Sequence, residues 1–265
     1  MSGLFNPTVA WITTRATLGR RRALLFAIPA VVLIVVTVAL KASRPPSRPW
    51  PSHVLGTFGF SVLLPLTALI IGSSVLGAEI DDGSAIHLLA TPVRRSSVII
   101  TKFLVATGLT IVFAAVPELI AALISGGGQT ESVVRFTPNG PVTTVPAAVI
   151  NNADFAIGLF VGALVCAVIY NAIFVMVSAA TTRAIAVGLL YLVVWEGLLA
   201  NLVPGVKLLS VSQYSLSVAD SIAHYPALHA HLTLGTAVAL AVIVTAAALA
   251  IGTRRLSRFS ITGDA

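Results

Sequence analysis

The stretch FAIGLFVGALVCAVIYNAIFVMVSAA, residues 155–180, contains no charged side chain. A helix needs about 20 mostly apolar residues to cross the hydrocarbon core of a bilayer, and this stretch is longer than that. Its apolar residues do not alternate with polar ones, as they do in the strands of a membrane β-barrel. The stretch therefore predicts a transmembrane α-helix.

The sequence on either side repeats this apolar character. Hydrophobic residues make up 57% of the 265-residue chain and charged residues only 9%, which is too little charge to cover the surface of a soluble domain. We therefore predict an all-α polytopic membrane protein in which residues 1–265 form a single transmembrane domain. The six expected transmembrane helices are Ala23–Leu40, Val54–Gly77, Phe103–Ile124, Phe155–Ala180, Ala184–Val203 and Leu232–Gly252.

The distribution of lysine and arginine orients these helices, because cytoplasmic loops of membrane proteins carry an excess of both. With the N-terminus in the cytoplasm, more basic residues fall on inner segments than on outer ones, so both termini are predicted to be cytoplasmic. The net charge of +7 follows from this bias and does not indicate a nucleic-acid partner. The inner basic residues are Arg15, Arg20, Arg21, Arg22, Arg94, Arg95, Lys102, Arg183, Arg254, Arg255 and Arg258, and the outer ones are Lys41, Arg44, Arg48, Arg135 and Lys207.

Residues 6–22 precede the first span and predict an amphipathic helix on the cytoplasmic membrane surface. Asn6 is a suitable N-cap, and Pro7 fits the first helical position, where its missing N–H is not needed. Val9, Ile12 and Ala16 recur at helical spacing and form the expected apolar face of this helix.

Two outer connections are long. Residues 125–154 begin with a run of glycines and are predicted to form a turn-rich external loop. Residues 204–231, before the last span, are moderately apolar and carry few charges. We expect this external segment to lie at the membrane interface or to dip back into the membrane.

Three histidines near the last span, His224, His229 and His231, have a spacing that metal ligands use. No cysteine lies near them, and Asp220 is the nearest carboxylate. We therefore interpret them as interfacial histidines and predict no metal site.

Residues 78–97 connect the second and third spans and hold the densest charge pattern in the chain. Gly83 permits a tight turn, and Ser84 is a suitable cap for the short helix that follows. Leu88 and Leu89 lie on the apolar side of that helix, and a proline after them disfavours its continuation. The pattern predicts a cytoplasmic elbow with an exposed apolar ridge, which favours a protein partner. An ordinary charged loop, capped at both ends, is the alternative.

The elbow residues resemble the signature of the membrane subunits of type-2 ABC transporters, the permeases of bacterial ABC exporters. That signature has a Glu, then Gly-Thr, then Leu-Leu-x-x-Pro-Val-x-Arg, then a Lys, and the spacings here agree throughout. Ser84 replaces the usual threonine and keeps its hydroxyl, and Lys102 is expected near the lipid headgroups. The matching residues are Glu79, Gly83, Ser84, Leu88, Leu89, Pro92, Arg95 and Lys102.

This resemblance implies the transmembrane permease subunit of an ATP-binding cassette exporter in the bacterial inner membrane. It implies two copies of a separate ATP-binding subunit, into which the elbow docks, and a second permease subunit, identical or different. The sequence has no Gly-x4-Gly-Lys-Ser/Thr loop with which to hold the phosphates of ATP. We therefore expect no cofactor and no catalysis in this chain, with ATP and Mg²⁺ held by the ATPase partner.

Two carboxylates lie inside the expected spans, where ionised side chains are costly and tend to face a cavity or a partner. Glu118, beside Pro117, and Glu196 both fall in the outer half of the membrane, judged from the rise of a helix. They are candidates for the translocation path, and hydrogen bonding between helices or a position at the outer interface is the simpler interpretation. The alternative function that they support is a proton-coupled secondary transporter.

Asn171 is a third candidate for the translocation path, and for it a hydrogen bond between helices is the favoured interpretation. Gly158 and Gly162 have the spacing of a helix-pairing motif. A chain with 20 glycines contains such pairs by chance, so this motif alone predicts nothing.

Overall fold

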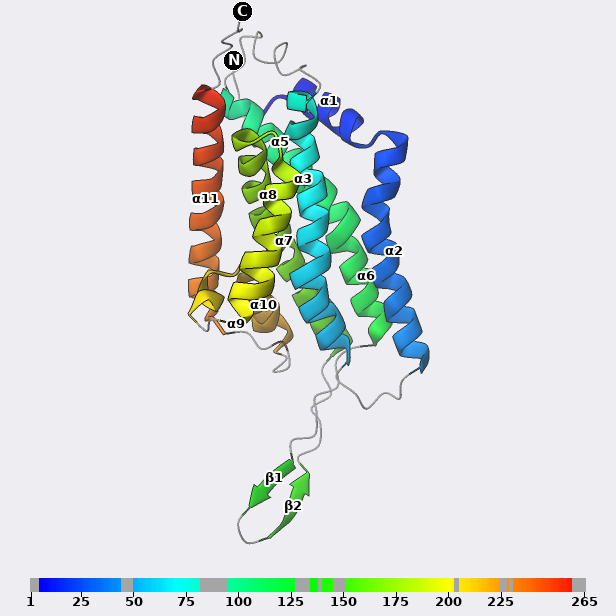
Figure 1. The fold of residues 1–265 in the computed structure, drawn as a ribbon. Helices are drawn as coiled ribbons and strands as arrows, with labels where there is room; N and C mark the ends of the chain where they lie inside the picture. Colours follow the sequence, from blue (N-terminus) through cyan, green and yellow to red (C-terminus); the bar gives the residue numbers. More distant parts are fainter. Residues whose placement is uncertain are drawn as a thin grey trace, which may run out of the picture.

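The computed structural model is a bundle of helices that stand side by side, with one two-stranded hairpin at one end (Figure 1). The helical class predicted for the membrane body is confirmed. The hairpin lies within the predicted external loop and was not expected from the sequence. The structure describes residues 5–43, 50–81, 95–126, 134–137, 140–144, 151–202, 205–224, 228 and 231–258.

The elements comprise α-helices, three π-helical segments (η1 to η3), one short 3₁₀ helix (η4) and the hairpin. The first half of the chain contains α1 (Pro7–Thr17), α2 (Arg20–Ser43), η1 (Ser52–Leu63), α3 (Leu64–Asp81), α5 (Arg95–Thr110), η2 (Ile111–Ala115), α6 (Val116–Ser125), β1 (Val134–Thr137) and β2 (Gly140–Thr144). The second half contains α7 (Asn152–Ala180), α8 (Ala184–Tyr191), η3 (Leu192–Leu199), α9 (Ala200–Leu202), η4 (Val206–Leu209), α10 (Val211–Ala223) and α11 (Leu234–Arg258). The two strands are antiparallel and pair Val134 with Thr144.

Five helices are long and apolar enough to cross a membrane, among the residues that the structure describes. The expected span Ala184–Val203 forms a shorter apolar helix, Ala184–Leu199, so its length alone does not establish a sixth crossing. The third span begins at Arg95 and not at Phe103, because its polar first turns are buried against neighbouring helices. The five long helices are Ala23–Ser43, Ser52–Leu76, Arg95–Ser125, Asn152–Ala180 and Leu234–Leu256.

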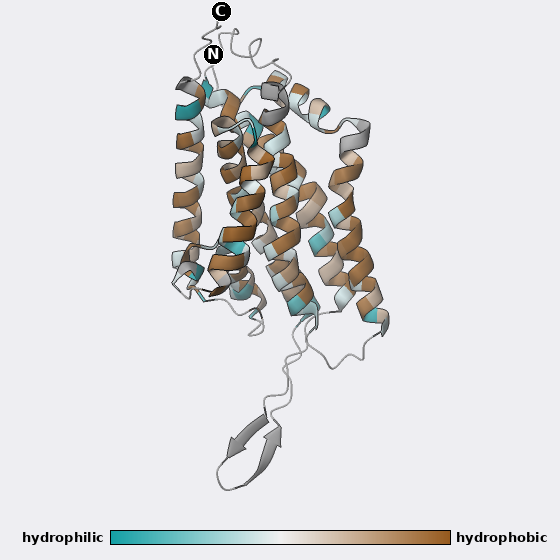
Figure 2. Cartoon of the chain, viewed as in Figure 1, coloured by the Kyte–Doolittle hydropathy of each residue, from teal (hydrophilic) through white to brown (hydrophobic). Residues whose placement is uncertain are grey.

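Hydrophobic residues cover the length of these helices, and hydrophilic residues gather toward their ends (Figure 2). Helix α1, the start of α5 and the end of α11 lie together at one end of the bundle, called here the α1 end (Figure 1). The hairpin and α10 lie at the opposite end, called the hairpin end. Helix α8 packs against α3 and α7 at the α1 end, and the chain continues from it through η3 to α9 at the hairpin end.

Helix α7 forms the centre of the bundle and packs against α3, α5, α6, α10 and α11. Asn151 caps its first turn, because the Asn151 side chain accepts a hydrogen bond from the Ala153 N–H at 3.2 Å. Tyr170 and Phe174 are fully buried on α7 and stack with their ring centroids 5.8 Å apart. The core of the protein is therefore built around one helix that contains no charged residue between Phe155 and its end.

Two of the three π-helical segments have a cause that is visible in the sequence. In η2 the Val116 N–H donates to the Ile111 carbonyl, five residues back, and the next residue, Pro117, has no N–H to donate. In η1 the Leu64 N–H donates to the Gly59 carbonyl, and a proline again follows. No proline accompanies η3, and nothing in its sequence explains its π-helical form.

Helix α1 begins as predicted, with Asn6 as its cap and Pro7 in its first turn. It ends at Thr17 and does not continue to residue 22. Ile12, on the predicted apolar face, is 51% exposed, and the membrane-facing role of that face stays a prediction. The residues that α1 buries, four positions apart, are Val9, Thr13 and Thr17.

Candidate coupling and translocation sites

The structure describes the two flanks of the predicted elbow. Helix α3 ends at Asp81 and α5 begins at Arg95, both at the α1 end (Figure 1). Glu79 lies in the last turn of α3, and its side chain is outside the description. Five other predicted elbow residues lie outside the described residues, and for them the sequence pattern remains the only guide: Gly83, Ser84, Leu88, Leu89 and Pro92.

Lys102, the last residue of the signature, is fully buried between helices, and its expected depth near the lipid headgroups stays a prediction. Its Nζ donates a hydrogen bond of 2.6 Å to the Val75 carbonyl, near the end of α3. A charged donor makes a stronger hydrogen bond than a neutral one. Lys102 therefore fastens α5 to α3 just inside the elbow.

Arg95, the first residue of α5, is attached to the last helix of the bundle. Its Nη1 donates a hydrogen bond of 2.6 Å to the Leu256 carbonyl in the last turn of α11. The last four carbonyls of a helix have no partner within the helix, and arginine commonly satisfies one of them. The elbow is thus joined to α11 as well as to α3.

Helix α1 is held by the same two turns of α5. The Asn6 N–H donates to the Thr101 Oγ1 at 3.1 Å, and Thr101 is buried beside Lys102 in the sequence. Helix α1 packs against both α5 and α3. The first two turns of α5 therefore bind α1, α3 and α11 into one unit, called here the α5 clamp (Asn6, Val75, Arg95, Thr101, Lys102 and Leu256).

Asn171 makes the interhelical hydrogen bond that the sequence favoured. Its Nδ2 donates to the Thr110 Oγ1 at 2.9 Å and to the Ala167 carbonyl at 2.8 Å, and both Asn171 and Thr110 are fully buried. The bond joins α7 to the end of α5. A role for Asn171 in translocation stays a prediction.

Glu196 holds the segment that precedes the last span. Its carboxylate accepts hydrogen bonds from the Val211 N–H at 2.8 Å, the Ser210 hydroxyl at 2.6 Å and the Ser212 hydroxyl at 3.1 Å. These donors lie at the N-terminus of α10, where unpaired N–H groups and the helix dipole favour an anion. Glu196 is 5% exposed and thus caps α10 from η3, a long-range contact that the sequence did not reveal.

We expect replacement of Glu196 by leucine to lower the free energy of unfolding by about 1–3 kcal/mol, because the α10 N-terminus loses a charged acceptor. Replacement by glutamine keeps one acceptor oxygen and a similar shape, so a smaller loss is expected. Thermal unfolding of the purified variants in detergent measures both. Equal stability of the leucine variant and the wild type would contradict the capping role.

Gly158 and Gly162, whose spacing alone predicted nothing, lie on the face of α7 against which α10 packs. A Cβ on Gly158 would lie 2.7 Å from the Ala219 carbonyl oxygen, and a Cβ on Gly162 would lie 2.7 Å from the Ser215 carbonyl oxygen. The absence of side chains therefore lets the backbones of α7 and α10 approach closely. The predicted external segment thus contains a helix that packs against the bundle, at the hairpin end (Figure 1).

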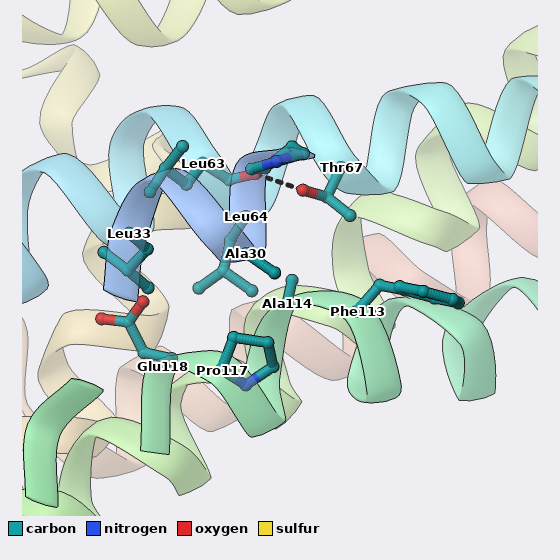
Figure 3. A pocket seen from close by; sticks show the side chains of 10 residues that line it. Ala30, Leu33, Leu63, Leu64, Thr67, Phe113, Ala114, Pro117 and Glu118 are labelled. Carbon is teal, nitrogen blue, oxygen red and sulfur yellow. Dashed lines mark hydrogen bonds between the residues drawn. The ribbon is translucent and has the colours of Figure 1, made fainter. Parts of the chain in front are cut away.

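Glu118 is 1% exposed, and neither of its carboxyl oxygens has a hydrogen-bond partner among the described residues. It lines a small cavity whose walls come from α2, η1, α3, η2 and α6 (Figure 3). The carboxyl lies beside Leu33 of α2, and Pro117 adjoins it on α6. The structure therefore places the two carboxyl groups in different surroundings: Glu196 accepts from three donors, whereas Glu118 has no hydrogen-bond partner in the described parts of the chain.

The histidines before the last span are only partly described. His224 ends α10 with a positive φ of 51°, and its Nδ1 lies 3.0 Å from the Ile222 carbonyl oxygen. His231 is described, and His229 lies outside the described residues. Within the described parts of the chain, no group of three metal-ligating side chains occurs.

Comparison with known families supports a membership that covers most of the chain. Residues 18–196 match the model of a family described as "ABC-2 family transporter protein". The match covers more than half of the chain, from the start of α2 to Glu196, and includes the elbow and both of its flanking helices. No curated protein matches the chain.

Proposed function

The chain belongs to the ABC-2 transporter family, and on that premise we propose that it is the transmembrane permease subunit of an ATP-binding cassette exporter. In this proposal the chain hydrolyses nothing itself. A separate ATPase subunit binds and hydrolyses ATP, and the permease converts the movement of that subunit into release of cargo across the membrane. The family match supports the transporter class, and the α5 clamp supports the mechanical role.

The α5 clamp is the observation that carries this role. Arg95 and Lys102, two residues of the elbow signature, bond to the carbonyls of Leu256 and Val75. A displacement of the elbow therefore moves α5 together with α3, α11 and α1, because charged hydrogen bonds and close packing join them. A partner that pushes on the elbow would shift half of the bundle as one piece.

The topology that we propose has six crossings and places the α1 end in the cytoplasm. The chain from α8 to α9 supplies the sixth crossing, since it runs along the bundle from the α1 end to the hairpin end. The α1 end carries more arginine than the hairpin end, in agreement with the charge rule for membrane proteins. The basic residues in the described parts of the chain are Arg15, Arg20, Arg21, Arg22, Arg95, Lys102, Arg183, Arg254, Arg255 and Arg258 at the α1 end, and Lys41, Arg135 and Lys207 at the hairpin end.

The proposed complex contains two copies of the ATPase subunit and two permease subunits, the second identical to this chain or different from it. ATP and Mg²⁺ bind to the ATPase subunits, since this sequence has no phosphate-binding loop. We place the complex in the bacterial inner membrane and regard residues 1–265 as one transmembrane domain. Helix α1, with Trp11 64% exposed and the Arg15 guanidinium 5.3 Å from its ring centroid, suits the membrane surface.

Reconstitution in vesicles separates this proposal from the proton-coupled alternative. Vesicles that contain the chain and its ATPase are expected to move cargo only when ATP is hydrolysed. Uptake by the chain alone, driven by a proton gradient and abolished by an uncoupler, would instead support the secondary transporter. The three donors around Glu196 favour a structural role for that residue and so weigh against the alternative.

A further inference from the structure

The Glu118 carboxyl lies within the bundle in a place that hydrogen bonding does not explain. Both oxygens are buried without a partner among the described residues. Burying a polar group without a hydrogen bond is costly, and burying an ionised carboxylate without a partner is far more so. The position of this side chain therefore points to a function other than holding helices together.

Three elements make room for the carboxyl. Leu33 of α2 lies beside it (Figure 3) and is 2% exposed. On η1, a Cβ at Gly59 would lie 2.6 Å from one carboxyl oxygen and 2.8 Å from the other, so the carboxyl rests against backbone that carries no side chain. Pro117 adjoins Glu118 on the third element, α6. The close fit at Gly59 indicates a site shaped for a carboxyl group.

The space at this site limits what it binds. The cavity has a volume of about 10 Å³, which is close to the least that one water molecule requires. Of the side chains that line it, only Thr67 and Glu118 carry oxygen, and the Thr67 hydroxyl donates to the Leu63 carbonyl at 2.8 Å. A metal ion needs several oxygen ligands, and an ammonium group needs more room. A proton bound to the carboxyl itself needs no further oxygen ligands and no additional space.

We propose that Glu118 is a proton-binding site, closed in this arrangement and opened when α2 separates from η1 and α6. In the closed site the carboxyl is the neutral acid, since the hydrocarbon around it cannot stabilise a charge. When the helices separate and water enters, the O–H bond of the acid breaks and the proton passes to water. The π-helical segments η1 and η2, each beside a proline, make the walls of the site suited to such a rearrangement.

None of the described charged or titratable groups on the neighbouring elements forms a hydrogen bond with the Glu118 carboxyl. Cys166 of α7 is a buried thiol and carries no charge that could pair with the carboxyl. Lys41 of α2 donates to the Ile124 carbonyl, farther along α6. His53 and Asp154, at the starts of η1 and α7, are exposed. Water access to the carboxyl is therefore the factor that controls its charge.

Infrared spectroscopy of the purified chain at neutral pH tests the closed state. The difference spectrum between the wild type and Glu118→Gln is expected to contain the band of a protonated carboxylic acid. Glu196→Gln, at a carboxyl that accepts three hydrogen bonds, is the control and should leave the Glu118 band unchanged. Carboxylate bands for Glu118 in the closed wild type would overturn the proposal.

Leu33→Ala tests release, because it removes the side chain that covers the carboxyl. We expect the Glu118 acid band to weaken in this variant at alkaline pH while carboxylate bands grow. The same substitution at Leu25, which lies on α2 and is 55% exposed, is the control and should leave the band unchanged. An acid band that Leu33→Ala does not alter would overturn the release step. These measurements use the purified chain alone, so their outcome does not depend on whether an ATPase binds.

Discussion

Replacement of Gly162 by alanine is expected to lower the free energy of unfolding by about 1–3 kcal/mol, the usual cost of overpacking a tight core. The new Cβ would lie 2.7 Å from the Ser215 carbonyl oxygen and 3.0 Å from the Ala219 Cβ, and neither belongs to a flexible side-chain end. Helix α10 must therefore move away from α7. Because Glu196 caps the same helix, that movement also strains the hydrogen bonds at its N-terminus. Thermal unfolding in detergent, compared with the wild type, measures the loss.

Gly108→Ala is a matched control for this prediction. Gly108 also lies within a transmembrane helix, α5, and a Cβ there would meet nothing within 4 Å. Alanine favours a helix over glycine by up to about 1 kcal/mol, so this variant is expected to be as stable as the wild type or slightly more stable. If the two glycine variants behaved alike, the close packing of α10 on α7 would be contradicted.

Replacement of Lys102 by methionine is expected to abolish ATP-driven transport and to lower the free energy of unfolding by about 1.5–3 kcal/mol, the contribution of a hydrogen bond to a charged group. Methionine fills much of the volume of the buried lysine stem and removes the charged donor that bonds to the Val75 carbonyl. The elbow would then move without moving α3. The ATPase is expected to bind this variant normally, since the Lys102 side chain is fully buried and offers no surface on which an ATPase could dock.

Transport by reconstituted vesicles, together with ATPase binding, checks this second prediction. Lys207→Met is the control, because Lys207 lies in η4 at the hairpin end, far along the chain from the α5 clamp. The control is expected to transport at the wild-type rate. Wild-type transport by Lys102→Met would show that the α5 clamp does not carry the movement.

The sequence predicted those features of the fold that depend on one segment at a time. The five long helices follow from uninterrupted apolar length, and the start of α1 follows from the order Asn6-Pro7. The family could also be recognised, because the elbow signature is compact and its spacings are regular. In each of these cases the information lies within a few dozen consecutive residues.

Features that depend on two distant segments could not be predicted in this way. From the sequence, Lys102 was expected near the lipid headgroups. The sequence around it does not show that its ammonium group donates to the Val75 carbonyl of α3. Gly158 and Gly162 looked accidental until α10 was seen to pack on them. Glu196 and Glu118 look alike as single acidic residues in apolar helices. The difference between them arises from tertiary contacts. Glu196 accepts hydrogen bonds from three donors at the start of α10, whereas the Glu118 carboxyl lies against the backbone at Gly59.

Co-purification from native membranes tests most directly the claim that the elbow docks on an ATPase. The wild-type chain is expected to carry an ATP-binding subunit through purification. Leu88→Asp, which places a charge on the apolar ridge of the elbow, is expected to lose that subunit while remaining inserted in the membrane. Leu208→Asp, at an exposed apolar position of the hairpin end, should retain it. Retention of the ATPase by Leu88→Asp, or its absence from the wild type, would contradict the account.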